Sequence, residues 1–216
     1  MRRLYIHPLL LRIWHWTNAV GFILLTLTGI QIRYVEYFNV VTFRTAVIWH
    51  YWVGFIVIGN FFIWLLFHLL TREARNYHAE LNPIKMFKGS LDQIVYYSYG
   101  IFKGFPNPFH LSKGHKFNPL QALTYQVVML VFVPLQCITG VLLWDIQRFA
   151  KVVDFFGGVR VVDTVHVLIF IVIACYIPFH AYLATLGRTP MEHIKSMITG
   201  YEEVEDDHAV DPDEKA

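Results

Sequence analysis

The chain has 216 residues, of which 56% are hydrophobic and only 16% are charged, and its formal net charge is +2. This composition excludes an ordinary water-soluble domain and indicates an integral membrane protein. The two cysteines occur without a C-x-x-C-H motif or a cysteine cluster, which excludes covalent c-type haem and iron–sulfur ligation. We expect no nucleic-acid partner.

Four stretches contain no Asp, Glu, Lys or Arg: 13–32, 45–71, 117–144 and 164–187. Each reaches the ~20 residues that a helix needs to cross a bilayer. Their apolar residues are continuous and do not alternate, which favours helices over strands. The sequence therefore predicts an all-α, integral membrane bundle of four transmembrane helices.

The first stretch is predicted to be a permanent helix, because no small-residue cleavage site follows its apolar region. Four spans place both termini on one side of the membrane. Thirteen of the 18 Lys and Arg residues fall on that side, so the positive-inside rule predicts cytoplasmic termini in a bacterial cytoplasmic membrane.

Two connecting segments have distinctive compositions. Within the long connection between the second and third spans, residues 92–104 are rich in Tyr and Phe and indicate an interfacial helix, with an ordinary loop as the alternative. The acidic segment after Tyr201 is expected to be solvated and poorly ordered. We place the membrane domain at 1–204 and the disordered tail at 205–216. No internal repeat is visible.

Histidines are concentrated in the spans, where ionisable residues are rare and usually face a partner inside the bundle. His180 follows His166 by 14 residues, which is a rise of about 21 Å on nearly one face of a helix. By depth, His50 matches His166 near the outer surface, and His15 matches His180 near the inner surface. Two stacked bis-histidine sites of this kind suit two b-type haems.

Other residues contribute to this prediction, and each of them has an alternative role. Gly29, Gly54 and Gly140 lie at the depth of the outer site and leave room for a porphyrin, unless they only allow close helix packing. His68 lies at inner depth; we expect it to point to the head-groups or to serve a propionate or a quinone, and replacing His15 as the partner of His180 is the alternative. The spans contain no carboxylate and no H-E-x-x-H, which argues against zinc-protease and di-iron sites.

The chain resembles the di-haem cytochrome b subunits of formate dehydrogenases, nickel–iron hydrogenases and thiosulfate reductases. The resemblance spans about residues 7–204 and rests on five features: RIWHWTNAVGFILLTLTGI, IWHYWVGF, KFNPLQALTYQVVMLVFVPLQCITGVLLW, the histidine spacing of the last span and the trailing HIKSMITGYEEV. The stretch YYSYGIFKGFPNPFH makes the chain most similar to the thiosulfate-reductase branch.

This resemblance implies the same ligand pairs, His50 with His166 and His15 with His180. It also implies an exchangeable quinone, menaquinone or ubiquinone, beside the inner haem, where Asn118 and Gln121 are candidate hydrogen-bonding residues. In purely structural terms, Asn118 followed by Pro119 is also typical of a helix N-terminus.

The predicted function is electron transfer between a periplasmic iron–sulfur or multihaem subunit and the quinone pool. The candidate docking surface is the loop 145–163 with Arg33 and Arg44, although Arg44 could instead pair with a haem propionate, as Arg12 could at the inner site. A stand-alone quinol-oxidising cytochrome that feeds multihaem cytochromes is one alternative. A non-redox transporter or anchor is another. The sequence does not fix the direction of electron flow.

Overall fold

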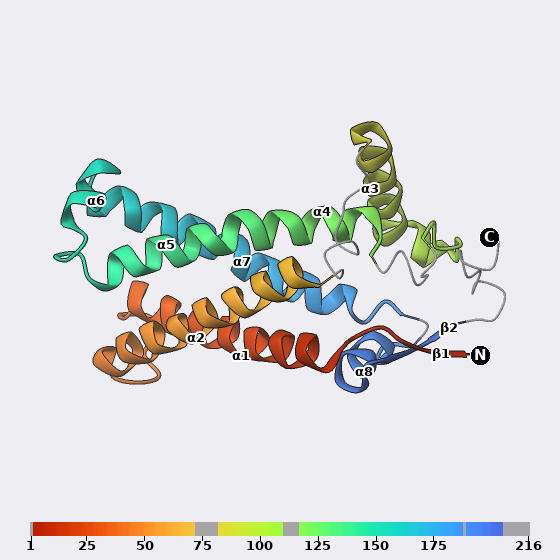
Figure 1. The fold of residues 1–216 in the computed structure, drawn as a ribbon, viewed down its shortest axis with the longest axis horizontal. Helices are drawn as coiled ribbons and strands as arrows, with labels where there is room; N and C mark the ends of the chain where they lie inside the picture. Colours follow the sequence, from red (N-terminus) through yellow and green to blue (C-terminus); the bar gives the residue numbers. More distant parts are fainter. Residues whose placement is uncertain (1, 72–81, 110–116, 188, 205–216) are drawn as a thin grey trace.

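The structure, a computed structural model, describes residues 2–71, 82–109, 117–187 and 189–204. Its elements in chain order are β1 (Arg2–Tyr5), α1 (Leu9–Arg33), α2 (Phe43–Leu70), α3 (Pro83–Ser98), the 3₁₀ turn η2 (Gly100–Lys103), α4 (Pro119–Val127), the π-helical turn η3 (Val128–Phe132), α5 (Val133–Trp144), α6 (Ala150–Phe155), α7 (Val159–Leu183), α8 (Glu192–Thr199) and β2 (Tyr201–Val204). Figure 1 shows the long helices side by side, with β1, β2 and α8 at one end. We call this the termini end.

Among the described residues, four helices are long and apolar enough to cross a membrane: Leu9–Arg33, Phe43–Leu70, Pro119–Trp144 and Val159–Leu183. The predicted four-helix membrane bundle is therefore confirmed. The last helix begins at Val159, before the predicted 164, because Arg160 and Asp163 join its first turns. Arg33 of α1 pairs with Asp163 at 3.4 Å, which compensates this charge near the end of the bundle.

The third crossing helix is continuous but contains the π-helical turn η3. Pro134 follows this turn and has no backbone N–H, so it cannot form the regular hydrogen bond to the preceding turn. The wider turn accommodates the proline within the span.

The bundle consists of two hairpins. α1 packs along α2, α5 packs along α7, and the main contact between the hairpins is that of α2 with α5. Gly21 allows close approach within the first hairpin, since a Cβ there would lie 2.7 Å from Val57. Trp14 and Asn60 also exchange hydrogen bonds across it, from Trp14 Nε1 to Asn60 O (3.0 Å) and from Asn60 Nδ2 to Trp14 O (2.9 Å).

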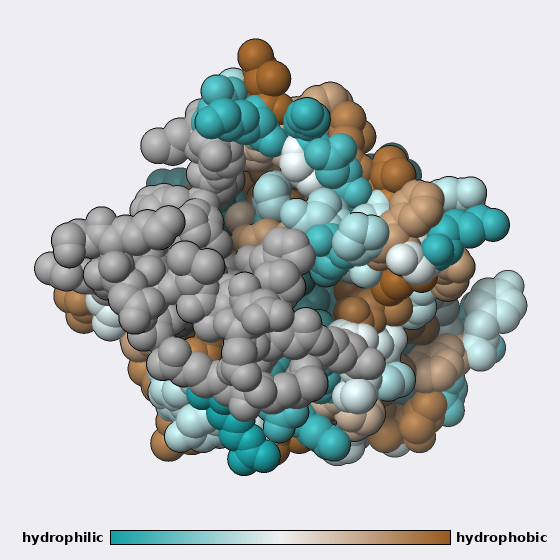
Figure 2. Space-filling model, turned by 90° about the vertical axis from the view of Figure 1, so that its right-hand side faces the viewer, coloured by the Kyte–Doolittle hydropathy of each residue, from teal (hydrophilic) through white to brown (hydrophobic). Residues whose placement is uncertain are grey.

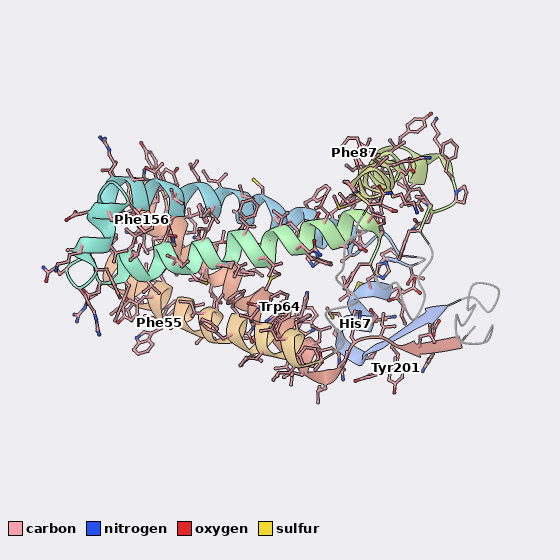
Figure 3. The ribbon with its side chains drawn as sticks, turned by 45° about the horizontal axis from the view of Figure 1, so that its top comes forward. His7, Phe55, Trp64, Phe87, Phe156 and Tyr201 are labelled. Atoms are coloured by element: carbon pink, nitrogen blue, oxygen red, sulfur yellow. The ribbon has the colours of Figure 1, made fainter. Side chains whose placement is uncertain are left out.

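Side-chain packing between the hairpins is sparse. The largest buried apolar cluster in the described residues, Leu142, Val153 and Val162, lies at the end opposite the termini, where α6 covers α5 and α7. Figure 3 places Phe156 at that end, and His7 and Tyr201 at the termini end.

The termini end carries two features that the sequence did not predict. β1 and β2 form an antiparallel pair in which Tyr5 is opposite Tyr201, and α8 precedes β2. Residues 202–204 therefore belong to a strand, which corrects the expectation that the chain is poorly ordered directly after Tyr201. The predicted tail 205–216 lies outside the described residues. Figure 2 looks onto this end and shows hydrophilic residues gathered on it beside hydrophobic ones.

The predicted interfacial helix is present as α3, but it begins at Pro83, earlier than the Tyr-rich stretch that indicated it. Asn82 starts the helix by accepting a hydrogen bond from the backbone N–H of Ile84 (3.0 Å). Figure 1 shows α3 running across the direction of the bundle at the termini end, the orientation expected of a helix in the plane of a membrane surface.

Candidate functional site

Two pairs of histidines bring together side chains from the two hairpins. The ring centroids of His50 on α2 and His166 on α7 are 6.4 Å apart, with an angle of 68° between the rings. Those of His15 on α1 and His180 on α7 are 6.2 Å apart, with an angle of 54°. The structure thus brings together the same two pairs that helix depth predicted.

Both separations fit two imidazoles that share one metal ion. A metal–imidazole nitrogen distance of about 2.0–2.1 Å, plus the radius of each ring, gives centroids about 6.3 Å apart when the rings bind from opposite sides. In the described part of the chain, no cluster of three or more His, Cys, Asp or Glu residues could hold a metal ion. Each pair is therefore suited to a cofactor that supplies its own equatorial ligands, such as haem.

The ring of His50 is oriented by α1. The Thr28 hydroxyl donates its hydrogen to Leu24 O (2.7 Å), so its oxygen must accept the hydrogen of His50 Nδ1 (2.8 Å). A Cβ at Gly29 would lie 3.4 Å from His50 Cε1. With Nδ1 protonated, Nε2 of His50 carries the lone pair that can bind a metal.

The same arrangement holds His166. The Thr139 hydroxyl donates to Leu135 O (2.8 Å) and accepts from His166 Nδ1 (2.9 Å), and a Cβ at Gly140 would lie 3.3 Å from His166 Cε1. The amide nitrogen of Gln136 lies 3.1 Å from His166 Nε2, which is the atom left for a metal. Gln136 must therefore leave this nitrogen when a metal binds.

The His15–His180 pair has different surroundings. The ring of Tyr176, one turn before His180 on α7, stacks on His180 with a centroid distance of 5.5 Å and an angle of 20°. Nδ1 of His15 is buried and has no hydrogen-bond partner among the described residues. A buried polar atom of this kind is costly without a partner and indicates that something is missing from this space.

His68 was the alternative partner of His180. Its side chain is buried, its Nδ1 donates to Trp64 O on the preceding turn (2.8 Å), and its ring lies 4.4 Å from that of Trp64. Figure 3 shows Trp64 toward the termini end of the bundle. The geometry thus favours His15 over His68 opposite His180.

The predicted glycines have two kinds of surroundings. Gly29 and Gly140 lie against the rings of His50 and His166 and make room for these rings, while the room predicted for a porphyrin remains a prediction. A Cβ at Gly54 would meet nothing within 4 Å, so this glycine borders open space.

Two arginines were predicted as partners for propionate groups. Arg12, one turn before His15, donates from Nη1 to Ile198 O at the end of α8, and its buried Nε has no hydrogen-bond partner among the described residues. Arg44 lies exposed in the first turn of α2. Arg33 pairs with Asp163, as described above, and this pairing competes with the docking role suggested for it.

Asn118 and Gln121 form a capping box at the start of α4. Asn118 Oδ1 accepts from Gln121 N (2.8 Å), and Gln121 Oε1 accepts from Asn118 N (3.2 Å). Asn118 Nδ2 also donates to the hydroxyl of Tyr97 on α3 (3.2 Å). These two residues therefore cap the start of α4, and their role in quinone binding remains a prediction.

The contacts of Thr28 and Thr139 with histidine rings were not predicted from the sequence. A threonine is ordinary in an apolar span, and its contact with a ring on the next helix cannot be read from one segment. The signal that could have found them is the repeated Thr-Gly dipeptide, in LTGI at 27–30 and ITGV at 138–141, each in a helix followed by a histidine-bearing helix.

Comparison with known proteins identifies the family of this chain. Residues 6–200 match the family described as prokaryotic cytochrome b561. The chain is also 34% identical over 202 residues to the cytochrome YdhU of Escherichia coli (strain K12), an alignment that covers 92% of this chain and 74% of that protein. No solved structure gives a significant match.

Proposed function

The chain belongs to the prokaryotic cytochrome b561 family, so it is a multi-pass b-type membrane cytochrome that serves electron transfer, and we propose that it binds two haem b groups. His50 and His166 would hold one of them, and His15 and His180 the other. The observation that carries this proposal is the separation of the rings, 6.4 Å in one pair and 6.2 Å in the other.

When bound, haem b supplies an iron that alternates between the ferric and ferrous states and so carries one electron at a time. The two histidines of each pair would hold the iron together, so neither oxygen nor a substrate would be expected to bind it. The chain is therefore suited to electron transfer and not to substrate chemistry of its own. α7 carries His166 and His180, so it would contribute one ligand to each pair and fix their relative depth.

Around the ligands, other residues would complete the sites. Gly54 would leave space beside His50. Arg12, with its buried Nε, would pair with a propionate near His15, and Arg44 would do so near His50. Two acidic groups near a membrane surface favour cations at these places.

We further propose that the chain links a periplasmic redox partner to the quinone pool. The excess of Lys and Arg on the side of the termini supports a cytoplasmic location of β1, β2 and α8 in the bacterial cytoplasmic membrane. Quinone would then bind beside the His15–His180 pair, with Asn118 and Gln121 as candidate contacts. An iron–sulfur or multihaem subunit would dock on the opposite end, around 145–163.

The test is a haem count on the purified chain and on its single His→Ala variants. Wild type should hold two b-type haems per chain by the pyridine haemochrome assay, low-spin in both oxidation states. His50→Ala and His166→Ala should each remove the same haem, and His15→Ala and His180→Ala the other, whereas His68→Ala should keep two. A wild-type protein without haem, expressed with ample haem and folded, would contradict the proposal. So would two haems in His166→Ala.

A further inference from the structure

We propose that Thr28 and Thr139 are positioning residues that set the orientation and tautomer of His50 and His166, and thereby lower the reduction potential of the haem held between them. This inference rests on the proposed function, because it concerns the haem site assigned to this pair. We call the two threonines, together with Gly29 and Gly140, the Thr-Gly sockets.

The two sockets have the same construction although they lie on different hairpins. Each threonine hydroxyl donates to the carbonyl four residues earlier, at 2.7 Å for Thr28 and 2.8 Å for Thr139. Each also lies within hydrogen-bond distance of the carbonyl three residues earlier, at 3.3 Å and 3.1 Å. Since the single hydroxyl hydrogen is used on the helix backbone, the oxygen is left to accept from the histidine.

The accepted hydrogen is the one on Nδ1 in both cases, at 2.8 Å from His50 and 2.9 Å from His166. Thr28 and Thr139 are themselves buried, with 7% of each exposed, so water does not compete for these bonds. The histidines are therefore held with Nε2 free of hydrogen.

The glycine that follows each threonine fixes the distance. An added Cβ would lie 3.4 Å from His50 Cε1 at Gly29 and 3.3 Å from His166 Cε1 at Gly140, and 3.9 Å from Nδ1 in both cases. The Cβ contact would be ordinary at Gly29 and tight at Gly140, so a side chain that extends beyond Cβ would press on the ring at either position. The dipeptide thus brings the helix backbone to the edge of the ring and places the hydroxyl at Nδ1.

The other pair lacks this construction in the described residues. Nδ1 of His15 is buried without a hydrogen-bond partner there, and His180 is flanked by the stacked ring of Tyr176. A hydrogen bond accepted from the far nitrogen of a ligating histidine makes the imidazole a stronger base. A more basic ligand stabilises ferric over ferrous iron, so the sockets should lower the potential at one site alone.

The experiment is a redox titration, followed by visible spectroscopy, of single-haem proteins. In His180→Ala the remaining signal comes from the His50–His166 site, and in His50→Ala it comes from the other. Thr28→Val and Thr139→Val keep the shape of threonine but remove the hydroxyl. Each should raise the midpoint potential in the His180→Ala background, both together should raise it further, and neither should change it in the His50→Ala background.

Two controls separate the hydrogen bond from general packing. Thr28→Ser keeps the hydroxyl and should restore the wild-type potential. Thr164→Val removes an exposed hydroxyl on α7 that donates to Arg160 O (2.7 Å), and it should leave both potentials unchanged. If Thr28→Val loses the haem but Thr28→Ser retains it at wild-type potential, the result also supports the proposal, because only the variant with a hydroxyl keeps the site intact.

The inference is overturned if Thr28→Val and Thr139→Val retain the haem with an unchanged potential. It is also overturned if they shift both sites equally, or if Thr28→Ser behaves as Thr28→Val. The proposed function fails in a different way: the His180→Ala and His50→Ala proteins would then not hold one haem each, which the haem count shows before any titration.

Discussion

Two glycines of α2 can be compared directly, because Gly54 borders open space beside His50 and Gly59 faces lipid. Both glycines lie on α2, and a Cβ at either would meet nothing within 4 Å, but Gly59 is exposed on the outside of the bundle while Gly54 is half-buried one turn after His50. If the space beside Gly54 receives a porphyrin, a side chain there competes with the cofactor.

We therefore expect Gly54→Leu to lower the occupancy of the haem at His50 and His166 and to leave the other haem bound. Gly59→Leu should retain both haems, because its side chain would point toward lipid. The measurement is the pyridine haemochrome count of each variant, purified after expression with ample haem. Equal occupancy in the two variants would show that the space beside Gly54 does not hold the cofactor.

The residue scale also shows what a single sequence can supply. His15, His50, His166 and His180 could be paired because depth on a membrane helix follows directly from residue number. The contacts of Thr28 and Thr139 could not be predicted in this way. They depend on which face of α1 packs against α2 and which face of α5 packs against α7. The sequence predicted correctly that Gly29 lies at the depth of His50, but not that the His50 ring itself lies against it.

At the scale of elements, the turn between α1 and α2 is built around one buried side chain. Gln31 is 2% exposed; its Oε1 accepts from the backbone N–H of Val40 (3.2 Å) and Val41 (3.3 Å), and its Nε2 donates to Val41 O. This residue lies one turn after Thr28 and holds the start of the helix that carries His50. The turn thereby sets how the two helices of the first hairpin meet.

Gln31→Leu should destabilise the protein by about 1–3 kcal/mol, because it removes the hydrogen bonds that the buried Gln31 side chain makes with the backbone of Val40 and Val41. The check is thermal unfolding of the haem-loaded protein in detergent, with amide hydrogen exchange at Val40 and Val41. Gln147→Leu is the matched control, since Gln147 lies exposed in the turn before α6 and should have little effect. Equal loss of stability in both variants would refute this role of Gln31.

The elements that were predicted correctly are those that the composition of their own segment determines. Four apolar stretches of sufficient length dictate four spans, whatever their neighbours are. β1 and β2 were missed because their pairing joins the two ends of the chain, and neither strand is longer than four residues. The start of α7 was placed too late because a rule based on the absence of charge cannot foresee that Arg33 compensates Asp163.

At the scale of the whole molecule, the two hairpins have little contact with each other, and the termini end links α1 of the first to the chain that follows α7 of the second. α8 is tied to α1 at its carboxyl end, where Trp16 Nε1 donates to Met197 O (3.0 Å) and the amide of Ile6 donates to Gly200 O (2.9 Å). Gly200 has a φ of 92°, and a Cβ there would lie 2.7 Å from the ring of Tyr5, so only glycine fits this junction. The position of α1, and with it His15, is therefore linked to the C-terminal part of the chain.

This junction also contains a titrating pair. His193 of α8 lies 3.4 Å from Glu202 of β2, and this hydrogen bond, assisted by the charges of Glu202 and Glu192, raises the pKa of His193 above its usual value. The raised pKa means that the stabilisation is fully present below the unfolded value of about 6.5 and is lost as the pH rises through the folded value. Because the His193 side chain is 42% exposed, solvent screens the pair and the effect should be small.

We therefore expect the termini end to open more readily at pH 8 than at pH 5.5. The measurement is hydrogen exchange at the amides of Ile6 and His7, which donate to Gly200 O, corrected for the intrinsic pH dependence of exchange. His193→Gln and Glu202→Gln should each abolish the difference in protection between the two pH values. If the difference persists unchanged in His193→Gln, another group governs the opening, and the link between this pair and the position of α1 must be abandoned.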